Sequence, residues 1–282
     1  NWQHPFLWMT LIVIWASLGS LRNAQPNLHF SAMGVLAAAM ILRRHWWLAA
    51  VCLVSATAIK PLGVAMMGLA VFVYPGCWRP LVVCNLVMLG LPFLLASPEY
   101  VISQYALFVE NLRDTSTVTD HRFADISGIV RTFGGELPTA VSLVIRPLAG
   151  VFTLGLWIVA GRSCGEPYRA LLLLSLASVY LMLFNPMTEP NSYIILAPAM
   201  AAVSMYLSDF DGRRRLGIVS AAMALSIGLL PEPLRHIWPN FSLWWHPTMA
   251  ALFGALVVYR AFLTSAAERG EIAGGDLRDS GR

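Results

Sequence analysis

Hydrophobic residues fall into ten stretches along the chain, separated by polar links. The stretches lie near residues 5–21, 28–42, 46–59, 61–74, 81–97, 139–160, 170–184, 192–207, 216–230 and 243–263. A helix that crosses a bilayer needs about 20 apolar residues and must satisfy its own backbone hydrogen bonds. The pattern therefore predicts an all-α, polytopic membrane helix bundle with about ten transmembrane segments, and it excludes a soluble fold.

Composition agrees with a protein embedded in a lipid bilayer. The chain is 57% hydrophobic and 12% charged, with a mean hydropathy of +0.65, whereas ordinary soluble domains carry about 25% charged residues. The net charge of +4 comes from arginines in the links, where basic residues set membrane topology. We therefore expect no nucleic-acid partner.

Lys60-Pro61 separates two of the stretches, which form either a helical hairpin or one long helix kinked at the proline. Lys and Arg in short loops stay on the cytoplasmic side of a membrane. With a hairpin, one face receives most of the 19 basic residues, namely Arg43, Arg44, Arg79, Arg162, Arg169, Arg213, Arg214, Arg215, Arg260, Arg269, Arg278 and Arg282. We therefore prefer the hairpin, in a multi-pass protein of the inner (plasma) membrane with both chain ends cytoplasmic.

The arms of the hairpin are shorter than the hydrocarbon core of a membrane is thick. Each arm has about 14 residues and spans about 21 Å, against a hydrocarbon core of about 30 Å. Its tip is therefore expected below the outer surface, with Lys60 near the depth of the lipid headgroups. Lys60 then either extends its amine to the interface from a helix end or contacts a phosphate.

The candidate binding and catalytic residues lie in the links on the outer face. Arg22, Asn23, Gln25 and Asn27 join the first two stretches, and amides with an arginine suit sugar hydroxyls and phosphate oxygens. The alternative is that Asn and Pro simply end helices and make the turn. Glu189, in another outer link, is a candidate base or hydroxyl-orienting carboxylate; the alternative is a solvated loop side chain.

The longest link is an outer loop at residues 98–138, which opens with a predicted amphipathic helix at the interface over 98–110. It divides a transmembrane bundle of residues 1–264, and residues 265–282, rich in glycine and charge, are predicted to form a disordered cytoplasmic tail.

Six short motifs occur in a characteristic order. They are Asn23-Ala24-Gln25-Pro26-Asn27, Ala58-Ile59-Lys60-Pro61, Cys77-Trp78-Arg79, Pro98-Glu99-Tyr100, Asp125-Ile126-Ser127-Gly128-Ile129-Val130-Arg131 and Asn185-Pro186-Met187-Thr188. Their order and spacing, over residues 5 to about 205, resemble glycosyltransferase family 87. Its members are polyprenol-phosphate-sugar-dependent, mannosyltransferase-like proteins of the C-type glycosyltransferase superfold.

The resemblance implies transfer of mannose or a similar hexose from a polyprenyl phosphate to a hydroxyl of a glycan, lipid or protein. The reaction would take place at the outer, periplasmic or extracellular face, with the lipid-linked sugar as substrate and no cofactor or metal assigned. The implied site residues are Glu189 and Asp125 as proton acceptors, Lys60 and Arg22 for the donor phosphate, and Asn23, Gln25, Asn27, Asn185 and Tyr193 for sugar or acceptor. The resemblance also implies a catalytic aspartate in an outer loop ahead of Asn1, and hence a longer protein.

Two other classes of membrane protein remain as alternatives. A secondary transporter would have two similar halves, each with an interrupted helix, and the sequence has no second counterpart of Lys60-Pro61. A lipid-linked oligosaccharide polymerase or ligase would also use a large outer loop, and Arg113, Arg122 and Arg131 are compatible with it.

Overall fold

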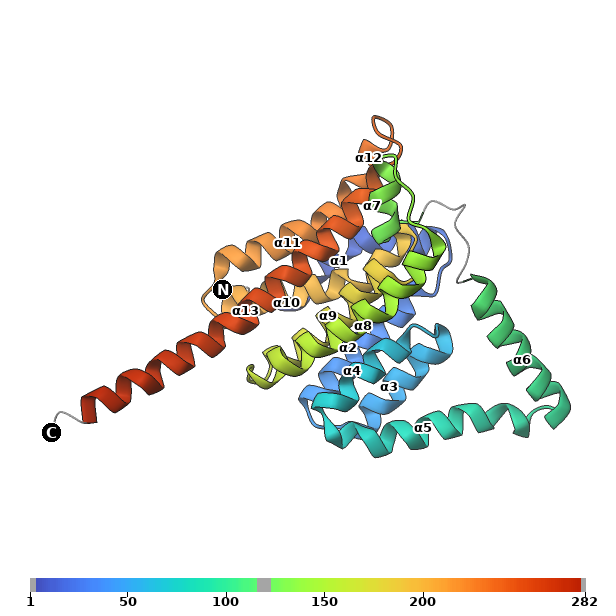
Figure 1. Ribbon diagram of the computed structural model, residues 1–282, viewed down its shortest axis with the longest axis horizontal. Helices are drawn as coiled ribbons and strands as arrows, with labels where there is room; N and C mark the ends of the chain where they lie inside the picture. The colour runs from blue at the N-terminus through green and yellow to red at the C-terminus, as the bar shows by residue number, and fades with distance from the viewer. Residues whose placement is uncertain (1–3, 116–122, 280–282) are drawn as a thin grey trace.

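The computed structural model describes residues 4–115 and 123–279, with side chains described up to residue 263 except at residue 115. Helices make up the fold of these residues, and no strand occurs among them. The elements are α1 (Pro5–Arg22), α2 (Asn27–Leu42), α3 (Trp46–Ile59), α4 (Gly63–Val73), η1 (Pro75–Cys77), α5 (Trp78–Gly90), η2 (Leu91–Leu94), α6 (Pro98–Thr115), α7 (Ile126–Thr132), α8 (Thr139–Arg162), α9 (Tyr168–Phe184), η3 (Pro190–Ile195), α10 (Ala197–Asp209), α11 (Arg214–Leu229), α12 (Pro231–Leu234) and α13 (Phe241–Asp279). Figure 1 shows most of them as one elongated bundle.

The helical membrane bundle expected from the hydrophobic pattern is confirmed, while the number of spans is not. Within the part of the chain that the structure describes, five helical segments are long and apolar enough to cross a membrane: Pro5–Arg22, Pro75–Leu94, Thr139–Arg162, Pro190–Asp209 and Phe241–Leu263. Four apolar helices, α2, α3, α4 and α9, are shorter. The remaining stretch, near residues 216–230, forms α11, which has 16 residues. Ten transmembrane segments therefore stay a prediction.

The hairpin at Lys60-Pro61 is present. Lys60 ends α3 with extended backbone angles (φ −145°, ψ 132°), as expected because a following proline disfavours the helical conformation. Gly63 begins α4 against the end of α3, and a Cβ atom on it would lie only 2.8 Å from the backbone nitrogen of Thr57. The turn is therefore tight enough to require glycine, and α4 runs back along α3.

The centre of the bundle is formed by α9, η3 and α10. Tyr193, Ile194 and Leu196 are fully buried, and most residues of α9 are buried. Trp157 on α8 is also fully buried, and its indole N–H donates to the carbonyl oxygen of Leu69 on α4 at 2.7 Å. Because η3 lies in this core, the residues just before it are held at a fixed place at one end of the molecule.

The predicted amphipathic helix at residues 98–110 is found as α6. Figure 1 shows α5 and α6 forming an arm beside the bundle. The arm is closed by the Tyr105 hydroxyl, which donates to the carbonyl oxygen of Leu89 at 2.8 Å, and by contact between the rings of Phe93 and Tyr105. Leu107 and Phe108 are exposed on α6, as an interfacial helix requires.

The last helix extends beyond the bundle. The backbone of α13 is helical as far as Asp279, and Figure 1 shows its C-terminal part projecting away from the other helices. The predicted boundary at residue 264 is not marked by a break in this helix, so the division into bundle and disordered tail stays a prediction. Residues 280–282 lie outside the described residues.

Candidate active site

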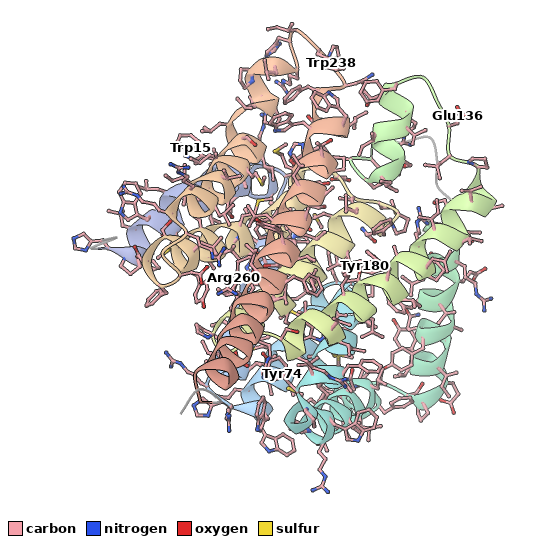
Figure 2. The ribbon with its side chains drawn as sticks, turned by 60° about the vertical axis from the view of Figure 1, so that its left-hand side comes forward. Trp15, Tyr74, Glu136, Tyr180, Trp238 and Arg260 are labelled. Atoms are coloured by element: carbon pink, nitrogen blue, oxygen red, sulfur yellow. The ribbon has the colours of Figure 1, made fainter. Side chains whose placement is uncertain are left out.

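Links that are far apart in the sequence meet at one end of the bundle. The link between α1 and α2 touches the link between α9 and η3 through a hydrogen bond from Gln25 to Glu189, and α1 touches η3 through one from Ser20 to Asn191. Figure 2 shows Trp238, from the link between α12 and α13, near one end of the molecule and Tyr74 near the other. We refer to the end that carries Glu189 as the site end.

Glu189 is a half-buried carboxylate held by a chain of amides. Its Oε2 accepts a hydrogen bond of 2.6 Å from Nε2 of Gln25, and Oε1 of Gln25 accepts one of 2.8 Å from Nδ2 of Asn27. Asn27 is fully buried. Because the amide of Asn27 must donate to the oxygen of Gln25, the nitrogen of Gln25 is turned toward Glu189. The two amides thus orient the carboxylate.

The start of η3 is docked on α1. The carbonyl oxygen of Asn191 accepts a hydrogen bond of 2.7 Å from the hydroxyl of Ser20, and the side chain of Asn191 lies directly against Gly19. Any side chain at Gly19 would collide with the Asn191 amide oxygen. Small residues at the end of α1 therefore allow the close approach that fixes the position of Glu189.

Lys60 belongs to the same end of the molecule. It lies half-buried in the link between α3 and α4, outside both helices. Burial lowers the pKa of its ammonium group, and the negative charge of Glu189 acts in the opposite direction. The interaction between the two charges places this cation within electrostatic range of the Glu189 carboxylate.

Two adjoining cavities open beside Glu189. One, of about 350 Å³, is lined by Glu189 and Phe123; the other, of about 440 Å³, is lined by Arg22 and His246. Both cavities are also lined by Pro190, Asn191 and Ser242, so they share a wall. Small-molecule sites have volumes of about 300–1,000 Å³ and a few converging polar groups, and this arrangement meets both criteria.

Three other predicted residues make internal hydrogen bonds. Asp125, 2% exposed, caps α7 by accepting from the backbone nitrogen of Gly128 at 3.0 Å and from the hydroxyl of Ser127. The hydroxyl of fully buried Tyr193 donates to the carbonyl oxygen of Ala124 at 2.8 Å. Nδ2 of Asn185 donates to the hydroxyl of Thr188 at 3.2 Å. These bonds shape the walls around Glu189.

Asn23 lies apart from these contacts. It is exposed, and its backbone N–H caps the C-terminus of α1. Ligand roles for Asn23, Asp125, Asn185 and Tyr193 stay predictions.

His246 is a cavity residue that the sequence analysis did not select. It comes from α13, its side chain is 2% exposed, and its ring lies 4.6 Å from that of Tyr193, measured between centroids. Its Nδ1 is 3.0 Å from the carbonyl oxygen of Ser242. The signal was an imidazole inside the hydrophobic stretch at 243–263, because titratable residues within a membrane segment usually line a functional cavity.

Comparison with known proteins identifies the family. The model of glycosyltransferase family 87 matches residues 2–186, which is more than half of the chain. The chain belongs to glycosyltransferase family 87. No curated protein and no solved structure matched it. The family match makes this chain a membrane glycosyltransferase and favours sugar transfer over transport.

The matched region covers only part of the candidate site. It includes Arg22, Gln25, Asn27 and Lys60, and it ends three residues before Glu189. The resemblance noted in the sequence was extended to about residue 205, beyond the end of this match. The assignment of Glu189 to the site therefore rests on the geometry of the structure. Its amide partners Gln25 and Asn27 lie within the region that matches the family.

Proposed function

We propose that this glycosyltransferase moves a hexose such as mannose from a polyprenyl-phosphate donor to a hydroxyl group of a glycan, lipid or protein. The reaction takes place at the site end, on the periplasmic or extracellular side of the membrane. One observation carries the proposal: the Glu189 carboxylate, oriented by Gln25 and near Lys60, lines a cavity that adjoins the cavity of Arg22.

The charged residues at the site end suit a nucleophilic displacement at the anomeric carbon of the donor sugar. The acceptor oxygen forms a bond to the anomeric carbon while the bond from that carbon to the phosphate oxygen breaks, and its electron pair leaves with the lipid phosphate. Arg22 and Lys60 stabilise the negative charge that develops on the phosphate. Glu189 accepts the proton of the acceptor hydroxyl.

Glu189 is the better proton acceptor of the two carboxylates suggested by the sequence. Asp125 is buried, and its Oδ1 accepts the hydrogen bonds that cap α7 and lies 3.9 Å from Nη2 of Arg131. Glu189 is half-buried and lines a cavity of about 350 Å³. A base must lie within hydrogen-bonding reach of the acceptor hydroxyl, and Glu189, unlike Asp125, lines the cavity in which we place that hydroxyl.

A transfer assay tests the proposal. The full-length protein is reconstituted in vesicles with a radiolabelled polyprenyl phosphate carrying mannose, glucose or galactose, and membranes of the producing cell serve as the acceptor source. Label is followed into the glycan, lipid and protein fractions. We expect transfer from at least one of these donors. Transfer from a nucleotide sugar alone would overturn the proposed donor.

Glu189→Gln tests the proton acceptor. We expect the transfer rate to fall by about 10²- to 10⁴-fold, the range typical of a lost general base. Glu136→Gln is the matched control, because Glu136 is an exposed carboxylate in the link before α8, and it should keep the wild-type rate. A loss below about tenfold for Glu189→Gln would assign proton transfer to another group.

A further inference from the structure

A second polar cavity lies at the end of the bundle opposite the site end. It has a volume of about 180 Å³ and is lined by Arg44 and Trp46 from the start of α3 and the link before it, Tyr74 after α4, and Glu166 and Arg169 before and within α9. Figure 2 shows Tyr74 at this end of the molecule. None of these residues takes part in the proposed sugar transfer.

One wall of this cavity is held together by hydrogen bonds. The Tyr74 hydroxyl donates to Oε1 of Glu166 at 2.9 Å, and Nη1 of Arg169 lies 3.9 Å from the same oxygen. Arg169 also donates to the carbonyl oxygens of Gly161 at 2.7 Å and Cys164 at 2.6 Å. Tyr74 and Arg169 therefore offset part of the charge of Glu166 within the wall, and the two carbonyl contacts fix Arg169 in place.

Arg44 brings a second cation to the cavity from an unusual backbone position. It ends α2 in the left-handed conformation (φ 59°), and its N–H donates to the carbonyl oxygen of Ile41 at 2.9 Å. Glycine is the residue usually found at this position after a helix, because a Cβ atom is strained there. Position 44 thus carries a long cationic side chain although its backbone conformation favours glycine, which has no side chain.

The surroundings of the cavity match the headgroup region of a bilayer. Trp47 and Trp78 are exposed at 57% and 58%. The exposed Arg79 follows Trp78 directly, and the exposed Arg43 precedes Trp47 by four residues. Tryptophan is enriched at membrane interfaces, and basic pockets between membrane helices bind anionic lipid headgroups. The cavity combines the guanidinium of Arg44 with a tryptophan and with a carboxylate whose charge is partly offset within the wall. It therefore suits an anion such as a phosphate ester, which arginine binds through paired hydrogen bonds, better than an apolar ligand.

We infer that this cavity binds a phosphate group, supplied by the headgroup of an anionic phospholipid, with Arg44 as its cationic ligand beside the pair formed by Arg169 and Glu166. The volume of about 180 Å³ accommodates a phosphate with a small alcohol such as glycerol. The inference is independent of the proposed sugar transfer, because its residues and its end of the molecule are different.

Native mass spectrometry of the full-length protein tests this site. The protein is released from detergent in the presence of phosphatidylglycerol, phosphatidylcholine, glycerol phosphate or inorganic phosphate. We expect phosphatidylglycerol to bind in preference to phosphatidylcholine, with a one-to-one adduct at the lowest lipid concentration. Tight binding of inorganic phosphate, with no preference for phosphatidylglycerol, would overturn the lipid source.

Variants of two arginines separate a specific site from surface charge. Arg44→Gln should weaken the first phosphatidylglycerol adduct by about tenfold, as expected for a lost charge-assisted hydrogen bond. Arg79→Gln removes the same charge from the first turn of α5, outside the cavity, and should leave that adduct unchanged. Equal losses in the two variants would overturn the site.

The variant Arg44→Gly tests whether misfolding, and not the lost guanidinium, explains the loss of the phosphatidylglycerol adduct. Glycine removes the guanidinium and relaxes the left-handed backbone, so this variant should fold with equal or higher thermal stability and still lose the adduct. Wild-type binding by a folded Arg44→Gly variant would overturn the inference.

Discussion

Gln25 illustrates how a neutral side chain can organise a charged one. Its oxygen accepts from Asn27 and its nitrogen donates to Glu189, so the amide has one allowed orientation. All three residues were selected from the sequence, but Gln25 and Asn27 were assigned to sugar binding. Glu189 is 164 residues away from Gln25, and no local pattern in a sequence reports a contact over that distance.

Replacing Gln25 tests this orienting role. Gln25→Leu removes the donor that holds Glu189, and we expect kcat for sugar transfer to fall by about tenfold, the effect of a lost hydrogen bond to a charged group. The donor KM should change little. Steady-state kinetics with the polyprenyl-phosphate donor checks both values. A change confined to KM would instead support the ligand role expected from the sequence.

Lys60 provides a prediction on pH dependence. Burial lowers the pKa of its ammonium group, so the positive charge is lost at a lower pH than in an exposed lysine. Because the charged form attracts the donor phosphate, kcat/KM for the donor should decline at alkaline pH. Lys60→Arg keeps its charge throughout this range and should abolish the decline. A pH profile of kcat/KM for both proteins checks this, and identical alkaline limbs would contradict it.

At the scale of elements, hydrophobic stretches predicted the helices well and their connections poorly. Each predicted stretch is largely helical, and the hairpin at Lys60-Pro61 was inferred from the distribution of arginines. The ion pair that ties α13 to the link between α10 and α11 was not predicted. Arg260 donates to both oxygens of Asp211 at 2.6 and 3.0 Å, and its guanidinium lies 4.3 Å from the ring centroid of Tyr168. In the sequence, Arg260 counts only among the topology-setting arginines, and no pattern marks Asp211 as its partner.

This ion pair should contribute strongly to stability because it is buried. The side chains of Arg260 and Asp211 are 6% and 14% exposed, and removing one partner leaves an uncompensated charge. Asp211→Ala should lower the free energy of unfolding by about 3 kcal/mol, and the double variant Asp211→Ala with Arg260→Met should recover part of that loss. Thermal unfolding in detergent measures both.

The control for this cycle is an exposed ion pair. Nη2 of Arg235 lies 2.8 Å from Oε1 of Glu232, with side chains 50% and 63% exposed. Glu232→Ala should change stability by less than about 1 kcal/mol. A loss as large as that of Asp211→Ala would show that burial does not distinguish the two pairs.

For the whole molecule, the structure separates two polar ends, and the sequence predicts which faces outward. Lys60 and the link between α1 and α2 lie at the site end, whereas Tyr74 and Glu166 lie at the other. The arginine distribution predicted this grouping. The cavities could not be predicted, because they arise from side chains of α1, η3 and α13 that meet only in the folded chain.

Cysteine labelling tests the orientation. In a protein with its four cysteines replaced, Asn23→Cys and Arg162→Cys place single exposed thiols at opposite ends of the bundle. An impermeant maleimide applied to intact cells should label Asn23→Cys, and Arg162→Cys should react only after the cells are opened. The reverse pattern would place the candidate active site in the cytoplasm.

The burial of η3 has a consequence for turnover. Tyr193 and Ile194 have no exposed surface, and Glu189 lies directly ahead of η3, so the backbone that carries this carboxylate is anchored in the core. The movements that exchange the polyprenyl-phosphate lipid between turnovers must then take place in other, less tightly packed segments. The α5–α6 arm, with its long exposed apolar surface beside the bundle (Figure 1), is where amide hydrogen exchange should be fastest during catalysis.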